Sequence, residues 1–151
     1  MMGECCCSNP RIQVIMPSTQ ESGDAVKVNF LRRELLDYGY IDPADLTLFS
    51  IVHAVDDALG HIDHFYRRYH SLRYVGDRLV VRLLEPLDDM RIDQLQQEFS
   101  DLLLPQGCIS RSGPLPEEAN ETQLQALPRL IIDFNRRDFA RLRHLIDAIN
   151  A

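Results

Sequence analysis

Hydrophobic residues in the first part of the chain follow two spacings in turn, which predict strands and helices in alternation. Short apolar runs at residues 11–16 and 47–52 are typical of buried strands, and Pro17 ends the first of them. Between these runs, hydrophobic side chains recur every three to four positions over residues 24–38. That spacing predicts a helix with one buried face, and Gly39 is placed to terminate it.

A second helix is predicted over residues 54–69, because its hydrophobic side chains again share one face. This stripe contains Val55, Leu59, Ile62, Phe65, Tyr66 and Tyr69. Strand, helix, strand and helix in succession are the pattern of a doubly wound α/β sheet. Two strands are too few to complete such a sheet, so this part of the chain is predicted to be incomplete by itself.

After His70 the hydrophobic residues alternate with polar ones, which predicts a β-hairpin. The alternating runs flank Gly76-Asp77, a dipeptide that suits a two-residue turn. That turn predicts three cross-strand pairs, namely Val75 with Arg78, Arg73 with Val80, and Ser71 with Arg82. Alternation assigns to the core the face that carries Leu72, Tyr74, Leu79, Val81 and Leu83. The opposite face is predicted to be half polar, with Arg73, Arg78, Arg82, Val75 and Val80.

The rest of the chain is predicted to add two strands and two helices to this hairpin. Asp88 is expected to cap the first helix, whose stripe contains Ile92, Leu95, Phe99, Leu102 and Leu103. Short strands at residues 107–113 and 129–135 flank an acidic, proline-containing surface loop. The last helix is expected to start from Asn135 and to bury Phe139, Leu142, Leu145, Ile146 and Ile149. The resulting order, β-β-α-β-β-α, describes a two-layer α+β unit.

The composition limits the cellular locations and the classes of partner that can be expected for the chain. The chain has 23 acidic against 16 basic residues and a net charge of −7, which weighs against nucleic acid as a partner. No run approaches the roughly 18 apolar residues of a membrane span. The first residues lack the basic and apolar regions of a secretory signal, so a cytoplasmic location without membrane contact is expected. Cys5, Cys6 and Cys7 are consecutive, and such thiols are predicted to lie in a disordered tail rather than to ligate a metal.

Arginine supplies fifteen of the sixteen basic residues and is therefore the candidate for contacts with an anion or a partner. The candidate positions are Arg67, Arg68, Arg73, Arg78, Arg82, Arg136 and Arg137. Arg136 and Arg137 are predicted in the first turn of a helix, where cations oppose the helix dipole. Acidic neighbours favour intramolecular ion pairs or interface contacts, and a phosphate-bearing ligand is the alternative.

Several histidines raise the question of a metal site. His61 and His64 lie three residues apart on a predicted helix, and His53, His70 and Asp57 are near them in sequence. Two histidines at this spacing can chelate a metal, but no third ligand follows from the spacing. The histidines are therefore interpreted as a solvated helix face, and neither a metal nor a cofactor is expected.

Two segments, "FYRRYHSLRYVGDRLV" and "FNRRDFARLRHLIDAIN", carry a resemblance to a known family. Residues 11–150 resemble the C-terminal portion of bacterial Lonely-guy (LOG) proteins, often labelled possible lysine decarboxylases or Rossmann-fold nucleotide-binding proteins. The resemblance implies Rossmann-type homodimers that hydrolyse the N-glycosidic bond of nucleoside 5′-monophosphates. It also implies that the segment after residue 70 is an α+β extension of the Rossmann domain.

The catalytic signature of that family has no counterpart in this sequence. The family carries a P-G-G-x-G-T-x-x-E loop, whose amides hold the phosphate and whose glutamate assists cleavage. Here the glycines are scattered, and none lies in a G-G or G-x-G cluster. No catalytic residue can therefore be transferred, and whether the chain is an enzyme stays open, with a non-catalytic role favoured.

These observations predict a fold between α/β and α+β in three parts. The expected parts are a disordered tail at residues 1–10, partial Rossmann-like strand–helix units at 11–70, and the two-layer domain at 71–151. The expected function is that of an accessory or dimerisation domain, associated with a second copy or with a separate catalytic Rossmann half. The alternatives are a nucleotide- or RNA-binding module on the arginine face, and the family reaction carried out only together with such a catalytic half.

Overall fold

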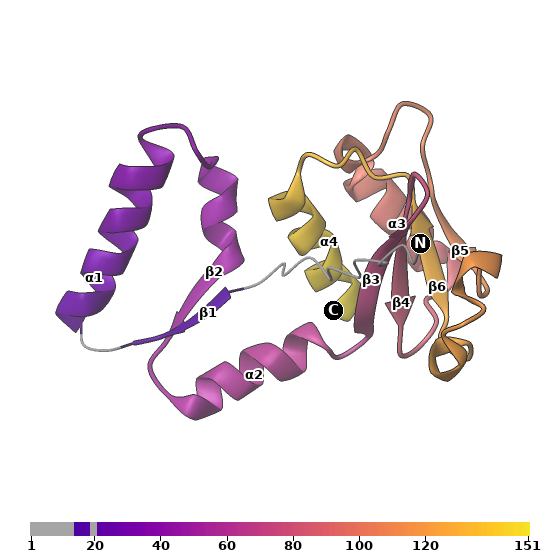
Figure 1. Ribbon diagram of the computed structural model, residues 1–151, viewed down its shortest axis with the longest axis horizontal. Helices are drawn as coiled ribbons and strands as arrows, with labels where there is room; N and C mark the ends of the chain where they lie inside the picture. Colours follow the sequence, from indigo (N-terminus) through magenta and orange to yellow (C-terminus); the bar gives the residue numbers. More distant parts are fainter. Residues whose placement is uncertain (1–13, 19–20) are drawn as a thin grey trace, which may run out of the picture.

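The computed structural model describes residues 14–18 and 21–151, which form two lobes joined by one helix (Figure 1). The first lobe contains β1 (Val14–Pro17), α1 (Glu21–Phe30), a π-helical segment (Leu31–Leu36), a 3-10 helix (Pro43–Leu48) and β2 (Phe49–Val52). Helix α2 (Val55–Phe65) leads to the second lobe. That lobe contains β3 (Tyr69–Val75), β4 (Arg78–Leu83), α3 (Asp89–Glu98), β5 (Ile109–Ser112), β6 (Arg129–Ile132) and α4 (Phe139–Asn150). The mixed α/β architecture predicted from the sequence is confirmed.

In the first lobe, β1 and β2 form a two-stranded parallel sheet with Val14 opposite Phe49. Helix α1 connects the two strands, which confirms the predicted strand–helix–strand order. The predicted first strand began at residue 11, and residues 11–13 lie outside the described part of the chain. Gly39 has a φ of +72°, a left-handed conformation that favours glycine and ends the helical segment as predicted.

The strand predicted over residues 47–52 is shorter than expected, because it begins at Phe49. Pro43 instead opens a 3-10 helix that continues to Leu48. The carboxylate of Asp45 stabilises the start of this helix by accepting a hydrogen bond from the Asp42 N–H at 2.9 Å. Local capping therefore outweighs the strand preference of the residues just before Phe49.

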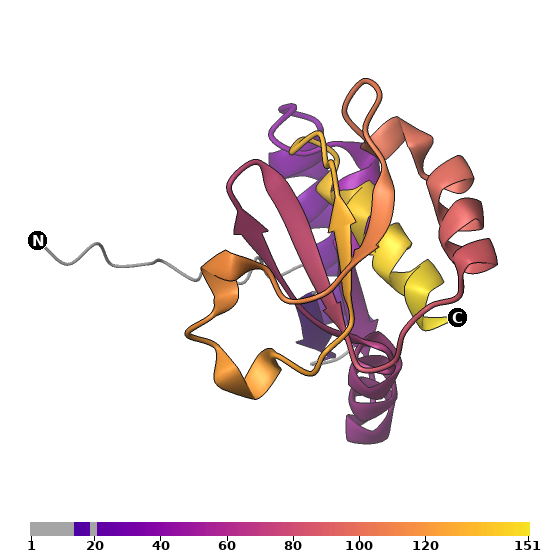
Figure 2. The same ribbon diagram turned by 90° about the vertical axis from the view of Figure 1, so that its right-hand side faces the viewer.

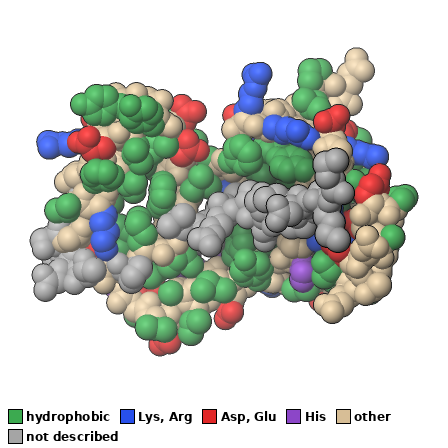
Figure 3. Space-filling view, viewed as in Figure 1, with side chains coloured by type: hydrophobic (Ala, Val, Ile, Leu, Met, Phe, Trp, Pro, Cys, Tyr) green, Lys and Arg blue, Asp and Glu red, His purple; other side chains and the backbone are tan. Residues whose placement is uncertain are grey.

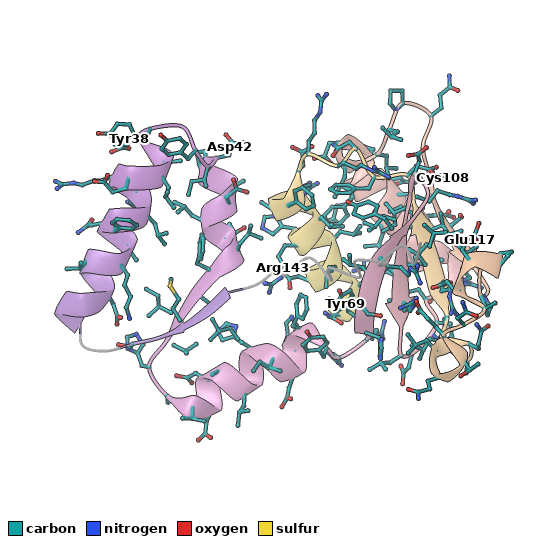
Figure 4. The ribbon with its side chains drawn as sticks, in the orientation of Figure 1. Tyr38, Asp42, Tyr69, Cys108, Glu117 and Arg143 are labelled. Atoms are coloured by element: carbon teal, nitrogen blue, oxygen red, sulfur yellow. The ribbon has the colours of Figure 1, made fainter. Side chains whose placement is uncertain are left out.

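Helix α2 ends at Phe65 rather than at the predicted residue 69. The cause is Asn150 of α4, which binds the backbone at the junction between α2 and β3. The buried amide of Asn150 donates a hydrogen bond to the Phe65 carbonyl at 2.6 Å. Its oxygen accepts the N–H groups of Arg68 at 2.8 Å and Tyr69 at 3.0 Å. The chain consequently leaves the helix and enters β3 at Tyr69. Figure 4 shows this junction next to α4, where the Arg143 guanidinium carbon lies 4.9 Å from the centre of the Phe65 ring.

The second lobe is built on a four-stranded antiparallel sheet with strand order β3-β4-β6-β5. The three predicted cross-strand pairs of the β3–β4 hairpin are all confirmed. Helices α3 and α4 cover one face of the sheet (Figure 2). The core on this side includes the predicted hairpin residues Leu72, Leu79, Val81 and Leu83, with Tyr74 partly buried at its margin. The β-β-α-β-β-α order predicted for this part is thus observed.

The opposite face of the sheet is covered by the connection between β5 and β6, residues 113–128, which we call the strap (Figure 2). These strands are antiparallel neighbours, and a two-residue turn can join such a pair. The longer strap contains two short 3-10 helices, Pro116–Glu118 and Thr122–Leu124. The prediction of a surface loop is wrong at its centre, because Glu118 is buried. Val75 and Val80 on the covered face are buried as well.

The two helices of this lobe begin differently. Asp88 caps α3 as predicted, because its side chain accepts the Arg91 N–H at 2.7 Å. The last helix was predicted from residue 136 but begins at Phe139. The Asn135 side chain accepts the N–H groups of Arg137 at 2.9 Å and Asp138 at 3.3 Å, which forms a turn ahead of the helix. Within the described part of the chain, no helix is long and apolar enough to cross a membrane.

Replacing Asn150 by alanine should destabilise the fold, because the Phe65 carbonyl and the Tyr69 N–H would lose their buried partner. Each buried group left without a hydrogen bond costs about 1–3 kcal/mol. We therefore expect urea denaturation to give a free energy of unfolding about 3 kcal/mol lower for Asn150→Ala. The control is Asn120→Ala, at an exposed position in the strap. Equal stability of the two variants would show that the Asn150 contacts do not hold the junction.

Candidate functional site

Two arginines lie directly opposite one another beneath the strap. Arg82 of β4 is in register with Arg129 of β6, and both side chains are buried. Like charges directly opposite in a sheet repel, so the pair needs an anion. Glu118 of the strap supplies it: one carboxylate oxygen accepts from Arg82 Nε at 3.0 Å, and the other from Arg129 Nε at 2.7 Å. A single buried carboxylate thus separates the two guanidinium groups.

A second strap carboxylate, Glu121, bridges the arginines nearer to solvent. Its two oxygens form ion pairs with Arg73 of β3 and with Arg82. The side chains of Arg73 and Glu121 are 19% and 28% exposed, whereas that of Glu118 is fully buried. These residues form the arginine cluster, which consists of Arg73, Arg82, Arg129, Glu118 and Glu121. Three cations and two carboxylates leave the cluster with one excess positive charge.

The strap is also held by bonds that do not involve Glu121. Arg129 Nη2 donates to the Leu124 carbonyl at 2.9 Å. The Glu118 carboxylate accepts the Leu115 N–H at 3.2 Å, and the Gln125 amide donates to the Glu118 carbonyl at 2.8 Å. The last two bonds lie within the strap, whereas the bonds of Glu118 with Arg82 and Arg129 and that of Arg129 with Leu124 connect the strap to the sheet.

The charge of Glu118 is maintained by its partners. Burial by itself raises the pKa of a carboxyl group. Hydrogen bonds from Arg82, the Leu115 N–H and Arg129 outweigh that effect and hold the pKa of Glu118 below its ordinary value. Glu118 is therefore ionised at neutral pH, as the two arginines require.

The seven arginines proposed from the sequence do not form one patch, since only Arg73 and Arg82 join the cluster. Arg67 and Arg68 lie at the α2–β3 junction, where Arg67 is exposed and Arg68 lines a shallow pocket with Arg91. The interpretation as intramolecular ion pairs therefore describes Arg73 and Arg82, and also Arg136, which lies 3.4 Å from a carboxylate oxygen of Asp77.

The remaining three arginines lie at or near the tip of the hairpin. Arg136 donates to the Gly76 carbonyl at 2.9 Å, and its guanidinium carbon lies 4.7 Å from the centre of the Tyr74 ring. The prediction that Arg136 and Arg137 occupy a first helical turn is wrong, because both precede α4 and Arg136 has a φ of +61°. Arg78 is exposed, and the ion pair at this end of the hairpin is formed by Arg136 and Asp77, at 3.4 Å.

The four histidines considered as metal ligands lie in two places. His53, His61, His64 and Asp57 line one shallow pocket beside the polar face of α2. His70 lies in β3, with Nδ1 2.9 Å from Ser71 Oγ. Among residues 14–18 and 21–151, no three histidine, cysteine or acidic side chains are arranged to hold a metal ion. Cys5, Cys6 and Cys7 fall outside these residues.

Sequence reasoning missed Arg129, Glu118 and Glu121. Arg129 begins an apolar strand, and its position opposite Arg82 becomes visible only when β4 and β6 are aligned. The two glutamates lie in a segment without hydrophobic periodicity. The sequence nevertheless contained one indication, the unusual length of the connection between the two predicted short strands. Connections of this length are often structured or functional.

Comparison with known proteins gives no match, either to a family model, to a curated protein or to a solved structure. The resemblance to the LOG family therefore rests on the sequence segments and stays a prediction.

Glu118→Gln should destabilise the second lobe, because it leaves Arg82 and Arg129 opposite each other without their shared anion. Breaking a buried ion pair from one side costs about 3–5 kcal/mol. We expect denaturant titration to show a loss of about this size. Glu117→Gln is the matched control, since Glu117 is the exposed neighbour on the strap (Figure 4). Similar stabilities of the two variants would contradict a structural role for Glu118.

The lowered pKa of Glu118 also predicts a pH dependence. The unfolded chain binds a proton at this residue near its ordinary pKa of 4.5, before the folded chain does. The contribution of Glu118 is therefore complete above pH 4.5 and is lost as the pH falls through the lower folded-state pKa. Unfolding measured at several pH values should show a smaller acid-induced loss for Glu118→Gln than for the wild type. Glu117→Gln should keep the wild-type slope.

Proposed function

We propose that the chain is a non-catalytic accessory domain of a LOG-type nucleoside 5′-monophosphate phosphoribohydrolase, and that it mediates association. Its partner is a second copy or a separate catalytic Rossmann half. The observation that carries this proposal is a continuous hydrophobic stripe on α2 that no described part of the chain covers.

The stripe consists of Val55, Leu59, Ile62 and Tyr66. Successive spacings of four, three and four residues place these side chains on one side of the helix. Their exposed fractions are 75%, 51%, 41% and 48%, so this part of the predicted stripe is largely open to solvent. Figure 3 shows hydrophobic side chains at the surface of α2 and of the first lobe. An exposed, continuous apolar surface of this kind marks an interaction site.

The first lobe buries few of its hydrophobic side chains. Among the residues before Phe65 whose burial the structure describes, Val52 is the only hydrophobic residue that is buried. Further large hydrophobic side chains exposed on this lobe are Val26, Phe30, Tyr38 and Tyr40. Parallel sheets occur almost only where both faces are covered, and this one has two strands among the described residues. A partner that supplies further cover would complete this arrangement.

The non-catalytic part of the proposal is supported by the sequence, which contains no glycine-rich phosphate loop. Release of free base from nucleoside 5′-monophosphates by the purified chain would overturn it.

The double substitution Leu59→Glu with Ile62→Glu should weaken association, because it places two charges in the middle of the stripe. Each buried side chain of this size contributes about 1.5–3 kcal/mol, so we expect affinity to fall at least about tenfold. Sedimentation velocity, with the chain alone and with the Rossmann domain of a LOG enzyme, measures the effect. The control is His61→Glu with His64→Glu, which adds the same charges to the opposite side of α2. A wild-type chain that stays monomeric and binds no such domain would contradict the proposal.

A further inference from the structure

Glu121 is the less firmly held of the two carboxylates in the arginine cluster. Glu118 is fully buried, and its carboxylate bonds two arginines and a backbone N–H. The side chain of Glu121 is 28% exposed, and its carboxylate bonds Arg73 and Arg82. The bonds of Glu118 and Arg129 do not involve Glu121, so an outward rotation of the Glu121 side chain would leave them intact.

Rotation of Glu121 would leave a concentrated set of hydrogen-bond donors. Arg73 and Arg82 would both lose their shared carboxylate, and Arg82 Nη1 lies 3.5 Å from the hydroxyl oxygen of Ser71. The Arg82 side chain is only 5% exposed, so packing fixes its guanidinium group. The Arg73 side chain is 19% exposed, so solvent reaches the cluster at this residue. The Arg82 donors are therefore nearly buried, and those of Arg73 on β3 are partly open to solvent.

The charge of the site identifies the class of anion that fits it. Without Glu121, three arginines and Glu118 carry a net charge of +2. A phosphate group carries about −1.5 to −2 at neutral pH and offers three acceptor oxygens. Arginine binds phosphate through paired N–H groups. A phosphate group therefore neutralises the open cluster more completely than the single negative charge of Glu121, which leaves an excess of +1.

We propose that Arg73, Arg82 and Ser71 form a binding site for a phosphate group, and that Glu121 occupies this site as an internal substitute for the anion. Binding exchanges one anion for another: the Glu121 carboxylate moves to solvent, and a phosphate oxygen bridges the two guanidinium groups in its place. The strap remains anchored by Glu118. This site is independent of the α2 stripe and does not rest on the proposed association.

Glu121→Gln tests the proposal, because it removes the competing charge and preserves the size of the side chain. Phosphate no longer has to displace a charged hydrogen-bond acceptor, so we expect inorganic phosphate to bind this variant at least about tenfold more tightly than the wild type. Titration with phosphate against chloride at matched ionic strength, followed by the NMR shifts of the Ser71 and Arg73 amides, gives the affinity. A parallel titration with glycerol 3-phosphate distinguishes a monoester site from one for the free ion.

Three controls locate the binding. Glu117→Gln makes the same charge change at an exposed position on the strap and should leave the affinity at the wild-type value. Adding Arg73→Gln to Glu121→Gln should abolish binding, whereas adding Arg78→Gln, an exposed arginine of the same hairpin, should not. Equal tightening by Glu117→Gln, or binding that survives Arg73→Gln, would overturn the proposal. If Glu121→Gln does not fold, excess phosphate must still raise the unfolding temperature of the wild type and not that of Arg73→Gln.

Discussion

The carboxylate of Glu118 between Arg82 and Arg129 is the interaction on which the second lobe depends. Without an anion, two buried cations would face each other across neighbouring strands of the sheet. That anion comes from the strap. The same segment therefore neutralises the two arginines and covers the second face of the sheet. Val80, on the same face of the sheet as the two arginines, is buried as well. Charge and hydrophobic burial are thus satisfied together.

The two lobes differ in how many of their hydrophobic side chains they bury. The second lobe has helices on one face of its sheet and the strap on the other, and its core is continuous. The first lobe has two parallel strands and leaves most of its apolar side chains at least partly exposed. The side chain of Asn150 in α4 is bonded to the C-terminal end of α2. The helix that carries the stripe is therefore fixed to the second lobe at that end. This contrast underlies the proposed association.

Local patterns predicted much of the fold because their causes are local. The Gly76-Asp77 turn and the alternation beside it determined the register of the hairpin, and Asp88 capped its helix as expected. The failures come from partners distant in sequence. Glu118 lies 36 positions from Arg82, and Asn150 lies 85 positions from Phe65. No periodicity reports such pairs, so the buried glutamate, the early end of α2 and most of the candidate site were not predictable.

The contact between Asn150 and the α2–β3 junction constrains the order of events during synthesis. Chains leave the ribosome from the N-terminus, and units that lack long-range contacts can fold as they emerge. Here the start of β3 is fixed by a residue made more than eighty positions later. The hairpin can therefore form early, but its attachment to α2 must wait until Asn150 has left the exit tunnel. The apolar stripe of α2 stays exposed once this contact has formed, so a partner chain can reach it both during synthesis and afterwards.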